Sequence, residues 1–293
     1  MIIVKLMGGL GNQLFQYAAG KALAIKHNTE LKVDLSFLNN EIDITYTKRN
    51  LELDVFNTSY SVASDEELEL FTKKNILQKI LKKYFNINLT KFYIANQTGF
   101  EYNIDFLSYP DNTLLIGFWQ SQNFFSTIRE ILLKELTIKK TMSQDCLMAH
   151  DAIVNSNSVS LHIRRGDYVS DKNANSFHGI LPLEYYYNAM NYLNQLTSNL
   201  KVFVFSDDID WVKSNLKLKN ESVYIDFNKN ENSVFDMYLM SLCKYNVIAN
   251  SSFSWWGAWL NQHPNKVVIS PKLWFVDNKI NTKDLIPSSW IQL

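Results

Sequence analysis

The segment with the most suggestive chemistry is SLHIRRGDY at residues 160–168. Because side chains alternate along a strand, His162 and Arg164 are expected on one side, with the apolar residues between them packed into the sheet. Arg164 would then stand at the carboxyl end of a parallel strand, where ligands bind in open α/β sheets. Two adjacent arginines are costly to bury without an anion, and the guanidinium fork matches a diphosphate. The alternative is a structural ion cluster in which the arginines pair with Asp167.

A glycine-rich turn near the N-terminus is a second candidate anion site. GGLGNQ at residues 8–13 follows an apolar run and precedes a helical pattern, so free backbone N–H groups and the helix dipole would point at a ligand. A tight strand-to-helix turn without a ligand explains the same glycines equally well. A nicotinamide cofactor is a further interpretation, because Asp34 ends the next predicted strand where a ribose-binding acid would sit. The third glycine of that fingerprint is replaced by Leu14, however.

Polar residues also follow the predicted strand that ends near residue 205. Ser206 or Asp207 is a natural N-cap for the next helix. Asp208 and Asp210 match the Asp-x-Asp pattern by which many sugar-nucleotide transferases hold a divalent cation. Because these aspartates fall on a predicted helix turn, we expect no metal site there.

A fourth polar segment, NSSFSWWGAW at residues 250–259, again joins a strand to a helix. Its Asn and Ser side chains could cap the helix or donate hydrogen bonds to a phosphate at the helix N-terminus. Trp255 and Trp259 lie four residues apart and share a helix face, which is most often a core face.

The predicted elements bring these strand ends together. Short apolar, β-branched runs alternate with amphipathic stretches, which predicts parallel sheets covered on both faces by helices. The expected strands cover residues 2–6, 31–34, 113–117, 159–163, 201–205, 222–225, 246–249 and 266–269, and helical patterns follow the first strand and Pro182. We therefore expect an α/β protein with two Rossmann-like domains facing a cleft, one over residues 1–152 and one over 153–293. Residues 41–112 are polar, aromatic-rich and irregular in pattern.

Composition narrows the class of protein. Lys plus Arg (29) balances Asp plus Glu (29), so the formal net charge is zero, which argues against a protein that binds nucleic acid by bulk charge. Cys146 and Cys243 give neither a disulfide framework nor metal-ligand spacing, so a reducing compartment is expected. The first apolar run is interrupted at Lys5 and Gly8, too early for a membrane span or a signal peptide. Any membrane contact would be peripheral.

Together, these segments resemble the bacterial branch of the α-1,2-fucosyltransferase family. GGLGNQLFQYA at residues 8–18 matches its N-terminal signature, and HIRRGDY at 162–168 matches the His-x-Arg-Arg-x-Asp motif shared with α-1,6- and protein O-fucosyltransferases. GFWQS at 117–121, SDD at 206–208 and the 250–259 segment match further blocks in the same order. Residues 41–112 carry no match, and acceptor choice is expected to lie there.

The resemblance implies a GT-B-like fold and an inverting galactoside α-1,2-fucosyltransferase, which moves L-fucose from GDP-β-L-fucose to the 2-hydroxyl of a terminal β-galactose. It implies no essential metal and no other cofactor. Arg164 would contact the GDP phosphates, His162 would lie near the nucleotide, and Asn12 would approach from the other domain. The other candidate donor-binding residues are Arg165, Asp207, Asp236 as a reader of guanine, Asn250, Ser251, Ser252 and Ser254.

Mechanistic reasoning supplies the remaining candidates. Negative charge on the departing GDP must meet a cation, which Arg164 can provide without a metal. Asp167 is the first candidate for a general base. Trp119, Gln120 and Tyr168 are candidate acceptor contacts, although Trp119 fits a core position equally well.

The expected partners are GDP-fucose and a galactose-terminated glycan, with no nucleic acid. The expected location is the cytoplasm, with peripheral contact at the inner face of the cytoplasmic membrane. Two other functions stay open: a nicotinamide-dependent oxidoreductase, and a non-catalytic nucleotide- or carbohydrate-binding protein.

Overall fold

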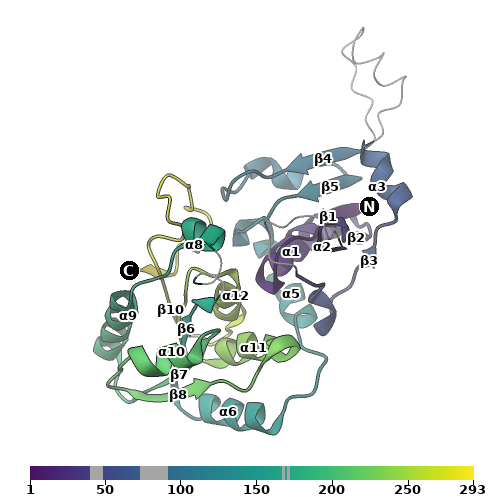
Figure 1. The fold of residues 1–293 in the computed structure, drawn as a ribbon. Coiled ribbons are helices and arrows are strands. Elements are labelled where there is room, and N and C mark those ends of the chain that lie inside the picture. The colour runs from purple at the N-terminus through teal and green to yellow at the C-terminus, as the bar shows by residue number, and fades with distance from the viewer. Residues whose placement is uncertain (40–48, 73–91, 167–168, 170–171) are drawn as a thin grey trace. The chain divides into compact units, whose positions relative to one another are not determined.

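The computed structural model describes residues 1–39, 49–72, 92–166, 169 and 172–293, which form two compact units (Figure 1). The first unit contains Met1–Lys139 and Lys283–Leu285, and the second contains Lys140–Thr282 and Ile286–Leu293. The chain thus changes units earlier than the predicted boundary at 152/153. The reason is helix α6 (Gln144–Val154), which packs on strand β6 (Asn157–Ile163) and helix α11 (Val234–Leu242) of the second unit.

The first unit is a parallel sheet of five strands in the order β3-β2-β1-β5-β4 (Figure 1). Its strands are β1 (Ile2–Lys5), β2 (Leu31–Asp34), β3 (Ser61–Val62), β4 (Tyr93–Asn96) and β5 (Thr113–Ile116). The helices described in this unit are α1 (Leu10–His27), α2 (Ser36–Asn39), α3 (Asp65–Thr72) and α5 (Arg129–Glu135), with short 3₁₀ turns at Leu53–Val55, Ile104–Ser108, Gln122–Phe124 and Ser126–Ile128. Helix α1 buries Leu14, Ala18 and Ala22 on its predicted apolar face.

The second unit is a parallel sheet of six strands in the order β11-β10-β9-β6-β7-β8. After β6, its strands are β7 (Leu200–Ser206), β8 (Glu221–Ile225), β9 (Tyr245–Val247), β10 (Val267–Ser270) and β11 (Ile291–Gln292). Besides α6 and α11, its helices are α8 (Lys172–His178), α9 (Leu183–Leu196), α10 (Ile209–Asn215) and α12 (Ser252–Leu260), with a 3₁₀ turn at Asn230–Asn232.

All eight strands predicted from the sequence are confirmed, with shifts of one or two residues at their ends. Three strands were missed. Strands β3 and β11 have two residues each, too few to show alternation, and β4 begins immediately after residues that match no regular pattern. All three lie at sheet edges, where pairing with a neighbour decides the conformation more than local pattern does.

The core of the second unit forms where α9 covers the sheet. Val159, Leu161 and Val202 from β6 and β7 pack with Tyr186 and Met190 of α9, and all are buried. Strand β7 has a continuous apolar run from Val202 to Phe205, which is typical of parallel sheets that are covered on both faces.

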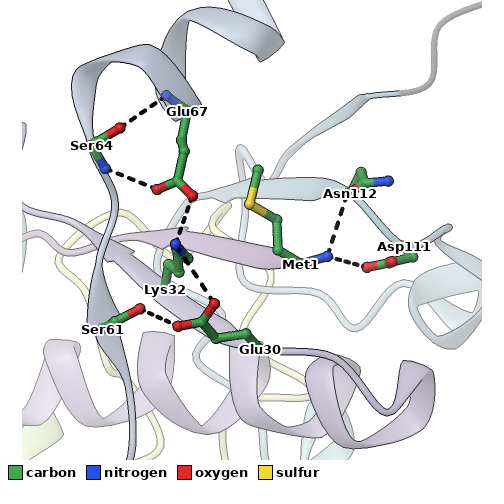
Figure 2. Close-up of polar contacts among 8 residues, drawn as sticks. All are labelled: Met1, Glu30, Lys32, Ser61, Ser64, Glu67, Asp111 and Asn112. Atoms are coloured by element: carbon green, nitrogen blue, oxygen red, sulfur yellow. Dashed lines mark hydrogen bonds and ion pairs between the residues drawn. The ribbon is translucent and has the colours of Figure 1, made fainter.

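The amino ends of the first sheet carry a network of charges, shown in Figure 2. The Met1 amino group lies 2.6 Å from the Asp111 carboxylate. Lys32 of β2 pairs with Glu67 at 2.6 Å and with Glu30 at 3.6 Å. These groups satisfy one another, so this edge has the character of a structural ion network. The candidate site residues follow the opposite, carboxyl ends of the strands. Among the described helices, none is both long and apolar enough to cross a membrane.

Candidate functional site

The second sheet has its topological switch point between β6 and β9. The chain proceeds from β6 to β7 and β8 on one side, then crosses back to β9 and β10 on the other. In open parallel sheets the crevice at such a point, outside the carboxyl ends of the strands, is the usual place for a ligand. Here Arg164 follows β6, Asp207 follows β7, and Asn250 and Ser251 follow β9. The fold therefore collects the predicted donor-binding segments at one sheet edge.

Arg164 and Asp207 form the central ion pair of this edge. Arg164 Nη1 lies 3.0 Å from Asp207 Oδ2, and the Arg165 backbone N–H donates to Asp207 Oδ1 at 2.8 Å. Burial alone would raise the pKa of Asp207, but the Arg164 charge and backbone N–H donors outweigh it, so this pKa is lowered. Gly166 permits the close approach, since a Cβ atom there would lie 2.8 Å from Asp207 Oδ2. Asp207 thus acts on the arginine segment and fixes its geometry.

Arg165 has a different environment. Its Nε atom lies 3.3 Å from Asp208 Oδ2, and its guanidinium stacks 3.5 Å from the centre of the Trp211 ring. This enclosure between a carboxylate and an aromatic ring gives Arg165 a structural role, so the predicted donor contact is not supported. Both arginines do take part in ion pairs, but with Asp207 and Asp208, and the pairing with Asp167 considered from the sequence stays untested. Asp167 and Tyr168 lie outside the described residues.

The Asp-x-Asp segment is used locally. Asp208 is the N-cap residue of α10, and its backbone N–H donates to Ser206 Oγ at 3.0 Å. The predicted cap was Ser206 or Asp207, so the helix begins later than expected. Within the described parts of the chain, no group of three or more His, Cys, Asp or Glu side chains is arranged to hold a metal ion.

Two histidines lie beside Arg164. His162 is only 4% exposed, and burial lowers its pKa to about 4, so the ring is neutral at pH 7. Its Nδ1 atom has no hydrogen-bond partner in the part of the chain that the structure describes, and its ring lies 6.0 Å from that of Phe253. The pKa of His178 is likewise lowered to about 4, by burial and by the Arg164 charge. His178 was not predicted, because only the return of α8 to the sheet edge brings it there.

The N-terminus of α12 borders the same edge. The Ser251 hydroxyl caps the helix by accepting the Phe253 N–H at 3.3 Å. Ser254 is buried and donates to the Ser251 carbonyl, and Asn250 Nδ2 donates to the His178 carbonyl at 2.8 Å. Asn250, Ser251 and Ser254 therefore hold the backbone of the site. Ser252, which is partly exposed, is the remaining candidate for a ligand contact. Trp255 and Trp259 are buried in the core, as their spacing predicted, and Trp256 is buried as well.

Asp236 lies in the first turn of α11, after the carboxyl end of β8. Burial raises its pKa to about 7, although Asn228 Nδ2 donates to its Oδ1 at 2.8 Å. A carboxyl group held near its neutral form is unusual in a structural role and is typical of functional sites. Asn228 was not predicted, because no local pattern connects it with Asp236.

In the first unit, the glycine-rich turn is enclosed by the chain itself. The Glu52 carboxylate accepts a hydrogen bond from the Leu10 backbone, at the start of α1, and burial raises its pKa. Gln13 donates to the Gly8 and Asn50 carbonyls at 2.9 and 2.8 Å, and accepts the Glu52 N–H at 2.9 Å. The helix terminus predicted to receive a ligand anion therefore already has a carboxylate from the protein. This contact favours the tight-turn interpretation for the backbone N–H groups at the start of α1.

Beside this turn, two predicted residues meet. Gln120 Nε2 donates to Asn12 Oδ1 at 2.8 Å. Trp119, by contrast, is 1% exposed and packs against Phe106 and Phe124, so it occupies the core position that was the alternative to an acceptor contact. Asp34 accepts the Ser36 N–H at 2.8 Å at the start of α2, which is a local capping role and gives no support to a nicotinamide ribose site.

Comparisons with known proteins agree with this architecture. The fold is similar to that of POFUT1 in complex with GDP-fucose, with a TM-score of 0.50 and 16% identity over 92% of this chain and 97% of that chain. It is also similar to Arabidopsis thaliana FUT1 in complex with GDP, with a TM-score of 0.51 and 12% identity over 91% of this chain and 69% of that chain. The fold is thus GT-B-like, as expected.

Relatives found by sequence share a higher identity with this chain than the solved structures do. An alpha-1,2-colitosyltransferase from Escherichia coli is 37% identical over 300 residues, covering 100% of this chain and 99% of its own. The O-antigen biosynthesis glycosyltransferase WbnK from Escherichia coli is 34% identical, covering 98% of this chain and 99% of its own. A galactoside 2-alpha-L-fucosyltransferase from Caenorhabditis elegans is 23% identical, covering 100% of this chain and 79% of its own. A family model matches residues 1–293, and the chain belongs to glycosyl transferase family 11.

Proposed function

We propose that this glycosyltransferase is an inverting α-1,2-fucosyltransferase that transfers L-fucose from GDP-β-L-fucose to the 2-hydroxyl of a terminal β-galactose. Membership of glycosyl transferase family 11 and relatives named for α-1,2 transfer support the reaction class. The observation that carries the proposal is the Arg164–Asp207 pair at the switch point of the second sheet. An oxidoreductase function has lost its support, since Asp34 caps a helix and the glycine-rich turn receives Glu52.

The donor is proposed to bind along the carboxyl edge of the second sheet. As the sugar leaves, negative charge grows on the diphosphate, and a preorganised cation lowers the energy of that transition state. Arg164 supplies the charge, and Asp207 holds its guanidinium in place at 3.0 Å. His162, which is neutral at pH 7, is proposed to lie near the nucleotide. Asp236 is proposed to accept hydrogen bonds from guanine.

Inversion requires the galactose 2-hydroxyl to attack from the face opposite GDP and to lose its proton. Asp167 remains our candidate for the general base. An Asp167→Asn variant should then lower kcat, with little change in the affinity for GDP. Equal turnover by the two proteins would mean that the reaction does not need this carboxylate. No metal or other cofactor is part of the proposed mechanism.

The identity of the donor sugar needs a direct comparison. Colitose is the 3-deoxy form of L-fucose, and a relative that is 37% identical is named for colitosyl transfer. GDP-fucose and GDP-colitose differ by a single hydroxyl group, which a binding site can distinguish only if it contacts that hydroxyl. We favour fucose, and both donors belong in the first assay.

The decisive experiment measures GDP release with lactose as acceptor and either GDP-sugar as donor. We expect faster release with GDP-fucose, and an α-1,2 linkage when the purified product is examined by NMR. Faster turnover of GDP-colitose would show that colitose, and not fucose, is the preferred donor sugar. GDP binding without turnover of either GDP-sugar would indicate a non-catalytic binding protein. A β-linked product would contradict inversion.

The acceptor is proposed to be a galactose-terminated glycan, and nucleic acid is not an expected partner for a chain with zero formal net charge. We also propose that the protein works in the cytoplasm, at the inner face of the membrane. Cell fractionation tests this location. If the protein is found in the membrane fraction and high salt releases it, peripheral contact with the membrane is supported.

A further inference from the structure

The first sheet has its own switch point, between β1 and β5, and a polar pair lies at its carboxyl edge. Asn12 comes from the first turn of α1, after β1, and Gln120 comes from the loop after β5. Gln120 is 7% exposed, while Asn12 is partly exposed. The hydrogen bond from Gln120 Nε2 to Asn12 Oδ1, at 2.8 Å, therefore joins a buried amide to one that solvent or a substrate can reach.

The contacts of Asn12 determine which end of its amide is presented. Its oxygen accepts from Gln120, so the NH₂ group is the end that can donate to another molecule. A Cβ atom at Gly8 would lie 2.5 Å from Asn12 Nδ2, so the amide lies directly against the Gly8 backbone. Gly8 also has a φ of +75°, which other residues rarely adopt. Both the glycine and Gln120 thus fix this amide.

The loop that carries Gln120 is held in a costly conformation. Gly117 has a φ of +144° and Trp119 a φ of +56°, which for a bulky residue costs about 1–3 kcal/mol. Packing of the Trp119 ring and a hydrogen bond from the Trp119 backbone N–H to Gln97 Oε1 maintain this conformation. Gln16 connects the loop to the glycine-rich turn, because it accepts the Met7 N–H and donates to the Gly117 carbonyl. Strain that persists in this way is typical of loops that position functional groups.

We propose that Gln120 is a positioning residue that orients the Asn12 amide so that its NH₂ group donates a hydrogen bond to a substrate oxygen. This inference rests on the proposed glycosyl transfer, and it replaces the direct acceptor contact predicted for Gln120. A glutamate at position 120 has no N–H to give to Asn12 Oδ1, and its carboxylate would attract the NH₂ group instead. The Asn12 amide would then turn and present its oxygen.

A double-mutant cycle tests this role. We expect N12A and Q120E each to lower kcat/KM by about ten- to hundredfold, and Q120A by a similar or smaller factor. The N12A/Q120A double variant should be no slower than N12A alone, because Gln120 acts only through Asn12. Losses that multiply in the double variant, or full activity of both Q120A and Q120E, would overturn the proposal. Q195E changes an exposed glutamine on α9 of the second unit and should leave kcat/KM unchanged.

A spectroscopic measurement separates this role from the proposed function. In protein labelled with ¹⁵N-asparagine, the Asn12 side-chain NH₂ signals are identified by their loss in N12A. They should shift in Q120A and Q120E and stay in place in Q195E. Unchanged signals in both Gln120 variants would contradict the orienting role even if activity fell. Absence of sugar transfer by the wild-type protein would refute the proposed function, and the NMR result would still decide whether Gln120 orients Asn12.

Discussion

Replacing Asp236 with asparagine should stabilise the protein above pH 7 and weaken its affinity for GDP. The carboxyl has a pKa of about 7 in the folded protein, against an ordinary value of 3.8, because burial disfavours its charged form. A raised pKa means that the folded state binds more protons than the unfolded state, so the free energy of unfolding falls as pH rises between these values. The loss in the free energy of unfolding that is due to Asp236 is small near pH 4, grows up to about pH 7 and is constant above pH 7.

The size of the effect follows from the two pKa values. The difference between 3.8 and about 7 corresponds to an upper limit of about 4 kcal/mol at pH 8. The Asp236 side chain is partly exposed, so water screens its charge, and we expect a value slightly below this limit, about 3–4 kcal/mol. The D236N side chain keeps an oxygen that can accept from Asn228 and has no charge to desolvate. Its advantage over wild type should therefore appear above about pH 4 and reach its maximum near pH 7.

Urea unfolding of the full-length protein at pH 4.5, 6 and 8 measures this difference. The control is D226N, which removes an exposed carboxylate whose pKa is lowered by its hydrogen bond to Lys213, and which should give no gain at pH 8. A D236N advantage that does not change with pH, or a D236N protein less stable than wild type at pH 8, would refute the reasoning.

The same carboxylate must be ionised to accept hydrogen bonds from guanine. Wild-type affinity for GDP should therefore fall by about tenfold between pH 8 and pH 6, since the pKa of free Asp236 is about 7. The terminal phosphate of GDP also titrates in this range. Calorimetric titration of wild type and D236N with GDP separates the two contributions to the change of affinity with pH. In D236N only the phosphate titrates, whereas in wild type both the phosphate and Asp236 titrate. If the affinity for GDP changes with pH in the same way in wild type and D236N, Asp236 does not contact guanine.

Three further outcomes are expected. Arg164→Ala should lower kcat by about a hundred- to thousandfold in a protein that stays folded but has a lower melting temperature, because Asp207 loses its ion-pair partner. Wild-type turnover by the folded variant would remove Arg164 from the mechanism. Transfer should continue in excess EDTA, whereas a strict need for Mn²⁺ or Mg²⁺ would direct attention back to Asp208 and Asp210. Tyr185→Phe should reduce the free energy of unfolding by about 1–3 kcal/mol without affecting kcat, because the buried hydroxyl donates to the Ile248 and Ile269 carbonyls at 2.7 and 3.1 Å. An unchanged urea midpoint would mean that these hydrogen bonds do not stabilise the protein.

The amino-acid sequence alone determined eight of the eleven strands in the described parts of the chain, the order of the polar loops and the edge of the sheet to which they belong. Those features depend on local patterns, since alternation and apolar runs mark a strand, and all parallel strands end at the same side. The sequence alone therefore placed Arg164 at the carboxyl end of a strand, which is the edge of the sheet where ligands are expected. The sequence blocks also identified the family that the comparison confirmed.

Tertiary structure decided which partner each polar group has. By its sequence, Arg165 could be a ligand contact or a structural ion, and its place between Asp208 and Trp211 favours the second role. The helix terminus at Gly9 and Leu10 could receive an anion by its sequence, and Glu52, some forty residues further along the chain, occupies it. A charge or a hydrogen bond acts over a few ångströms of space, whereas sequence patterns report only neighbours along the chain. Partners that distant loops bring together, such as Asn12 and Gln120, can therefore be found only in the folded protein.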